Sequence, residues 1–86
     1  MEINFTTEAM EHIELYKKAG DTASIKKIKL LIESMKVNPF EGLGKPEALK
    51  YELTGCWSRR INKENRIVYR LTEKSIEIIG LKGHYK

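Results

Sequence analysis

Apolar residues alternate with polar ones at the start of the chain and then recur at helical spacing. MEINF (residues 1–5) alternates in this way, which is typical of a short strand. After it, apolar residues lie four and three positions apart, as one face of a helix requires. These residues are Ala9, Ile13 and Tyr16. The pattern predicts a first helix that runs to about Ala19.

A second and stronger helical pattern follows. Its apolar positions are Ile25, Ile28, Leu31, Ile32 and Met35. Asp21 or Thr22 is suited to cap the start of this helix, because both side chains accept hydrogen bonds from backbone N–H groups. The helix must end before Pro39, since the proline ring pushes the preceding residue out of the helical region.

The second half of the chain has the texture of β-structure. PFEGLGKPE (residues 39–47) contains two prolines and two glycines and predicts an irregular loop. CWSRRIN, RIVYRLT and SIEIIGLK follow, separated by short turns, and predict an antiparallel meander. In RIVYRLT, Ile67, Tyr69 and Leu71 share one face. Arg66, Val68 and Arg70 share the other, away from the helices.

These elements predict one α+β domain over residues 1–86. We expect an N-terminal strand and a helical hairpin packed on one face of a twisted, mostly antiparallel sheet, whose other face is partly open and basic. No segment approaches the roughly 20 apolar residues of a membrane span. The N-terminus lacks the pattern of a secretory signal, and Cys56 is the single cysteine, so we expect a cytoplasmic protein. With one Cys and two His, we expect neither a structural metal nor a cofactor.

Positive charge is concentrated in the second half of the chain. Residues 1–44 contain six Lys against seven acids (net −1), and residues 45–86 contain six Lys and four Arg against five acids (net +5). The four arginines are Arg59, Arg60, Arg66 and Arg70. Because the planar guanidinium suits phosphate oxygens, a polyanion is the leading class of partner.

A basic sheet could bind RNA without cutting it, so the candidate acid and base matter. Cleavage of RNA without a metal needs a base for the 2′-OH, an acid for the leaving 5′-oxygen and fixed positive charge at the phosphorus. Glu47 is the best candidate base, His84 the candidate acid, and Arg66, with Arg60 beside it, the candidate phosphate clamp. Glutamate in a loop, arginine on a strand and histidine near a terminus are each more often ordinary surface residues than catalytic ones. His12, the other histidine, is expected on the exposed side of the first helix and without a role.

Several spaced motifs resemble one family. PFEG-x-GKPE, the L-TG-xWSRRI run, the RIVY strand and the terminal His-Tyr resemble YoeB-type toxins (Txe/YoeB family, within the RelE/ParE superfamily). This resemblance implies a ribosome-dependent mRNA endonuclease, the toxin of a bacterial type II toxin–antitoxin pair. On matching positions, Glu47 would be the base, His84 the acid and Arg66 the transition-state clamp. Arg60, Lys50 and Tyr85 would hold phosphate or orient the substrate.

The resemblance also implies partners and leaves some positions open. It implies two partners: a YefM-like antitoxin with an acidic segment, and mRNA in the ribosomal A site. It is also compatible with a homodimer. GHYK would be the end of the last strand and would carry His84 across the sheet. The chain departs from the pattern at Cys56 and at Gly83, and Gly83 is expected to loosen the backbone beside His84. Trp57 suits a core or dimer contact better than base stacking.

Two other functions fit the same sequence. The ParE branch of the superfamily resembles this fold but inhibits DNA gyrase by binding, and a pure inhibitor would not need Glu47, Arg66 and His84. A plain RNA-binding module would show salt-dependent affinity without turnover.

Overall fold

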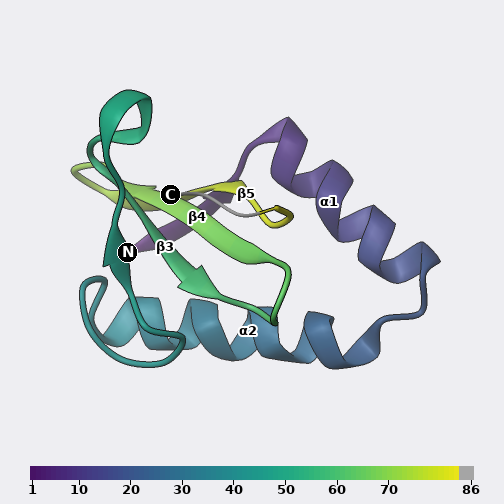
Figure 1. Ribbon diagram of the computed structural model, residues 1–86. Coiled ribbons are helices and arrows are strands. Elements are labelled where there is room, and N and C mark those ends of the chain that lie inside the picture. The colour runs from purple at the N-terminus through teal and green to yellow at the C-terminus, as the bar shows by residue number, and fades with distance from the viewer. Residues whose placement is uncertain (84–86) are drawn as a thin grey trace.

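The computed structural model describes residues 1–83, and residues 84–86 lie outside the described part. The described residues form two α-helices, a short 3₁₀ helix and a five-stranded sheet (Figure 1). In chain order, the elements are β1 (Glu2–Phe5), α1 (Thr7–Lys18), α2 (Thr22–Val37), β2 (Glu47–Ala48), the 3₁₀ helix η1 (Tyr51–Leu53), β3 (Cys56–Arg60), β4 (Arg66–Leu71) and β5 (Ser75–Gly80).

Both helices begin at side-chain caps. The Thr6 hydroxyl accepts a hydrogen bond from the Ala9 N–H, and the Asp21 carboxylate accepts one from the Ser24 N–H. The hydrogen bonds from Ser24 hold the pKa of Asp21 below its usual range. Since α2 ends at Val37, two residues before Pro39, the predicted helix limits are confirmed to within a residue.

The sheet has the strand order β1-β5-β4-β3-β2. Strands β2 to β5 pair antiparallel, as the predicted meander requires, and β1 pairs parallel with β5. The α+β fold is therefore confirmed. Two details differ from the sequence prediction: Glu47 is not in the loop but begins the short strand β2, and η1 was not expected.

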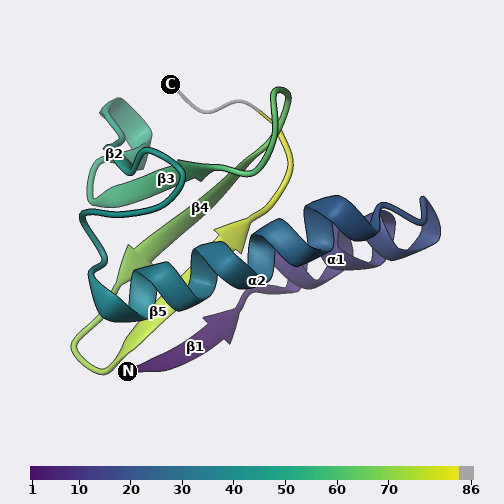
Figure 2. The same cartoon turned by 90° about the horizontal axis from the view of Figure 1, so that it is seen from below.

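Helices α1 and α2 cover one face of the sheet (Figure 2). The core between them contains the apolar stripes of both helices and the apolar face of the strands, as predicted. Its buried members are Ala9, Tyr16, Ile28, Leu31, Met35, Ile61, Ile67, Tyr69, Ile76, Ile78 and Leu81.

The opposite face of the sheet carries a second, smaller apolar cluster. Leu49, Cys56 and Val68 are buried there, and Leu53 and Ile79 pack against them. The segment from β2 to η1 thus covers part of this face. The expectation that the face away from the helices is partly open holds beyond this cluster, where Arg60, Arg66 and Arg70 lie. Neither helix within residues 1–83 has the length and apolar character to cross a membrane.

Candidate active site

Strand pairing places Glu47 and Arg66 on the same face of the sheet. Glu47 lies opposite Ser58 on β3, and Ser58 lies opposite Val68 on β4. Directly opposite residues share a face, and so do residues two apart on one strand, so Arg66 lies diagonally across from Glu47. The Arg66 Nη2 atom is 3.7 Å from the Glu47 Oε2 atom. Residues 19 positions apart in the sequence thus form an ion pair at the edge of the sheet.

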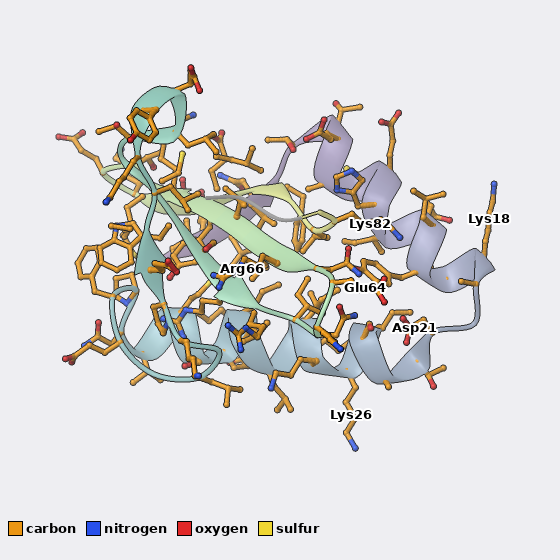
Figure 3. All side chains as sticks on the ribbon, in the orientation of Figure 1. Lys18, Asp21, Lys26, Glu64, Arg66 and Lys82 are labelled. Carbon is orange, nitrogen blue, oxygen red and sulfur yellow. The ribbon has the colours of Figure 1, made fainter. Side chains whose placement is uncertain are left out.

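The two members of this pair differ in exposure. The Arg66 side chain is 10% exposed and the Glu47 side chain 60% exposed. The Arg66 Nη1 atom also donates a hydrogen bond of 2.8 Å to the Ser58 hydroxyl, and Ser58 is fully buried. The guanidinium is therefore held in place from beneath, while the carboxylate remains accessible to a ligand. Figure 3 labels Arg66, which lies over β3 and β4.

Arg60 adds a second guanidinium to this face. It pairs directly with Arg66 across β3 and β4, and its side chain is exposed. Among residues 1–83, no hydrogen bond or ion pair engages the Arg60 guanidinium. An exposed cation beside a fixed one can receive a phosphate without first breaking an internal contact.

The segment that leads to Glu47 is packed closely against the core. Gly44 has a φ of +85°, and a Cβ atom there would lie 2.6 Å from Leu31 Cδ2 and 3.2 Å from the Arg60 carbonyl oxygen. The Gly44 carbonyl accepts a hydrogen bond of 2.7 Å from the Arg60 N–H. Only glycine combines this backbone conformation with so close an approach.

Lys50, a predicted phosphate-binding residue, follows β2, is exposed, and precedes η1.

Arg59 does not belong to this surface, although the sequence grouped it with the other arginines. Its side chain is fully buried beneath the sheet and points to the opposite face from Arg60. Its five donated hydrogen bonds go to Ser34 Oγ, Asn38 O, Glu41 O, Leu43 O and Tyr69 Oη, at 2.6–3.0 Å. All its N–H groups are occupied, so Arg59 anchors the loop before β2 and has none left for a phosphate.

Arg70 is also occupied. Its guanidinium forms an ion pair with Glu77 on the neighbouring strand β5. Of the four arginines, only Arg60 and Arg66 therefore combine a place on the Glu47 face of the sheet with the capacity to bind a ligand.

Residues 5–85 match a family described as the YoeB-like toxin of bacterial type II toxin–antitoxin systems. A Synechocystis protein named toxin YoeB is 44% identical over 86 residues, covering 100% of this chain and 99% of that protein. The chain belongs to the YoeB-like toxins. The fold agrees with this: the structure of the YoeB dimer from Staphylococcus aureus superposes with a TM-score of 0.90 at 42% identity, covering 99% of this chain and 98% of that one. YoeB in the heterotetrameric YoeB–YefM complex from the same species gives a TM-score of 0.87 at 42% identity, with the same coverage.

The predicted site of this YoeB-like toxin is only partly described by the structure. Glu47, Arg60 and Arg66 come together on one face, and Lys50 follows two residues after β2. His84 and Tyr85 lie outside the described residues. The expectation that the last strand continues into GHYK is wrong for its described part, because β5 ends at Gly80 and the following residues form a bend.

The sequence analysis missed Ser58 and misjudged His12. Ser58 was not a candidate, yet its alternation with Arg60 on β3 places it on the same face and beneath Arg66. His12 is not on the exposed side of α1: it is half-buried, and its Nδ1 atom accepts a hydrogen bond from the Leu81 N–H. Trp57 packs against the core, with its ring centroid 5.0 Å from that of Phe40.

Proposed function

We propose that this YoeB-like toxin is a ribosome-dependent mRNA endonuclease that acts in the cytoplasm as a single domain of residues 1–86. The observation that carries this proposal is the accessible Glu47 carboxylate beside the fixed guanidinium of Arg66, 3.7 Å away, on the open face of the sheet. A protein that only bound RNA would not need an accessible acidic group beside Arg66, whereas a ribonuclease needs a proton acceptor there.

The proposed reaction uses side chains and the internal nucleophile of RNA. Glu47 takes the proton of the 2′-OH, and the 2′-oxygen forms a bond to the adjacent phosphorus. The bond from phosphorus to the 5′-oxygen breaks, and His84 donates a proton to that oxygen. The products are a 2′,3′-cyclic phosphate and a 5′-hydroxyl. No metal and no cofactor enters this sequence of steps.

Positive charge on the sheet stabilises the extra negative charge of the phosphorane. Arg66 is suited to this, because a guanidinium already fixed by Ser58 needs little reorganisation when the charge develops. Arg60, opposite Arg66, and Lys50 would hold the flanking phosphates, and Tyr85 would orient the substrate. Because the face of the sheet is open, we expect the ribosomal A site to position the mRNA against Glu47 and Arg66.

The proposed partner is a YefM-like antitoxin with an acidic segment that covers the basic face. The family assignment and the YoeB–YefM complex of the Staphylococcus aureus relative support this. The dimer of that relative supports a homodimer as a second assembly. Ribosome-bound cleavage that continues at the normal rate when the toxin is saturated with its antitoxin would contradict the proposal.

The test is primer extension on a defined mRNA in a reconstituted translation system, with and without ribosomes. We compare the wild type with Glu47→Gln and His84→Gln, and use Glu52→Gln as the matched control because Glu52 is an exposed acid on the nearby η1. Acid or base catalysis contributes about 10²–10⁴-fold, so each active-site variant should lose at least about 100-fold. The control should cleave normally.

Two outcomes would overturn the proposal in different ways. Ribosome-dependent cleavage that persists in the Glu47→Gln and His84→Gln variants would remove these residues from the mechanism. No cleavage by a folded wild type would exclude the endonuclease, and inhibition of DNA gyrase would be the next activity to measure.

A further inference from the structure

Side chains of α1 form hydrogen bonds with both the N–H and the carbonyl of Leu81. His12 Nδ1 accepts a hydrogen bond of 2.9 Å from the Leu81 N–H, and the Tyr16 hydroxyl donates one of 2.6 Å to the Leu81 carbonyl. His12 and Tyr16 are four residues apart on α1 and therefore project from the same side of the helix. Leu81 lies just beyond the end of β5, so these two side chains take the place of a neighbouring strand.

The hydrogen bond to Leu81 requires that the Nδ1 atom of His12 act as an acceptor. A ring nitrogen accepts a hydrogen bond only while it carries no proton, so His12 binds Leu81 as an imidazole unprotonated at Nδ1. The side chain of Leu81 is fully buried in the core, which fixes the residue from a third direction. Lys82 turns toward α1, with its Nζ atom 4.8 Å from the centroid of the Tyr16 ring (Figure 3).

The next contacts connect this segment to the candidate active site. The Gly83 N–H donates a hydrogen bond of 3.0 Å to Asn65 Oδ1, and the Gly83 carbonyl accepts one of 3.1 Å from the Arg66 N–H. Gly83 has a φ of +98°, which glycine adopts without strain. Both the N–H and the carbonyl of Gly83 are therefore hydrogen-bonded to neighbouring residues of the described chain. The described chain thus ends beside Arg66, the residue whose guanidinium contacts Glu47.

We propose that His12 is a positioning residue for catalysis: together with Tyr16 it holds Leu81, and so sets the point from which the chain delivers His84 to the reacting phosphate. This rests on the proposed endonuclease function. His84 is the residue after Gly83, and consecutive Cα atoms are about 3.8 Å apart, so the position of Gly83 limits where the chain can place this residue. A displacement of about 1 Å at a catalytic group can cost about 100-fold in rate.

The test measures single-turnover and steady-state cleavage of ribosome-bound mRNA. His12→Leu keeps the bulk of the side chain but removes the acceptor, and His12→Asn places an amide oxygen close to the position of Nδ1. Glu11→Leu, at the neighbouring exposed position of α1, is the control for an added leucine. Tyr16→Phe removes only the hydrogen bond to the Leu81 carbonyl.

We expect His12→Leu to lower kcat about 10- to 100-fold with KM within about twofold, because the residues proposed to hold the RNA phosphates, Arg60 and Lys50, are unchanged. His12→Asn should recover most of the lost rate, and Glu11→Leu should match the wild type. Tyr16→Phe should lower kcat as well. The losses in the His12→Leu/Tyr16→Phe double variant should be less than additive, since both act on Leu81.

Each remaining outcome decides the matter. Wild-type kcat in a folded His12→Leu variant overturns the positioning role, even when the wild type cleaves and Glu47→Gln does not. Should His12→Leu not fold, wild-type kcat in Tyr16→Phe overturns it. A wild type that cleaves no mRNA overturns the endonuclease and this role with it.

Discussion

Replacing Arg59 should strongly destabilise the protein, whereas replacing its neighbour Arg60 should leave the stability almost unchanged. Arg59 is fully buried and donates five hydrogen bonds, and Arg60 is exposed on the other face of β3. The perturbation is Arg59→Met, which keeps an unbranched chain and removes the guanidinium. Arg60→Met is the matched control. Both are made in the Glu47→Gln background, so that toxicity does not limit expression.

The expected loss in the free energy of unfolding follows from the acceptors that lose their hydrogen-bond donor. Arg59→Met leaves the three loop carbonyls of residues 38, 41 and 43 without their donor, together with the hydroxyls of Ser34 and Tyr69. The loop carbonyls regain water in part, and the buried cation no longer has to be desolvated. We therefore expect a loss of about 3–5 kcal/mol rather than the sum of five bonds. For 86 residues the total stability is about 4–13 kcal/mol.

The assay is urea denaturation followed by far-UV circular dichroism and by the fluorescence of Trp57, the single tryptophan. Trp57 contacts Phe40 in the loop that Arg59 anchors, so its emission reports on that loop directly. Arg60→Met should stay within about 0.5 kcal/mol of its parent. An Arg59→Met protein within about 1 kcal/mol of its parent would refute the anchoring argument.

Three further predictions concern the core and the site. Burial raises the pKa of Tyr16 to about 12. The neutral hydroxyl therefore contributes fully to stability below its ordinary pKa of about 10, and this contribution is lost as the pH rises through 10 toward 12. Tyr16→Phe should cost about 1 kcal/mol at about pH 8 in urea titrations, and the variant should lose less stability than the wild type as the pH rises above 10. Gly44→Ala should cost about 1–3 kcal/mol more than Gly55→Ala in thermal unfolding, because both glycines have positive φ but only Gly44 is closely packed. Ser58→Ala should slow mRNA cleavage about tenfold or more in the primer-extension assay, because Arg66 loses its hydrogen bond; an unchanged rate would contradict a positioning role for Ser58.

Periodicity was sufficient to predict the helices and the meander. The stripe from Ile25 to Met35 and the alternation in RIVYRLT each depend on local spacing, and both faces lie as expected in the structure. Strand β2 has only two residues and no periodicity of its own. Its pairing with β3 depends on the packing of Gly44 and Leu49, which no local pattern reveals.

The site was less accessible to sequence reasoning because residue type does not determine surroundings. Arg59 and Arg60 are adjacent and chemically identical, yet alternation along β3 buries one and exposes the other. The alternation was readable in the sequence, but the acceptors around Arg59 come from α2, from a distant loop and from Tyr69 on β4. His12 is similar: its partner is a backbone N–H 69 positions away, so its spacing on α1 carries no signal of the contact.

The two arginines of the RRI run also connect stability to catalysis. Arg59 fixes residues 38–43 from the core side, and the same loop continues through Gly44 to Glu47 on the opposite face. Arg60 then bonds its backbone N–H to the Gly44 carbonyl and presents its guanidinium beside Arg66. The position of the proposed base therefore depends on a residue that cannot touch RNA. A variant of Arg59 that still folds should lose mRNA cleavage through displacement of Glu47, while its affinity for RNA, carried by Arg60 and Arg66, stays near that of the wild type.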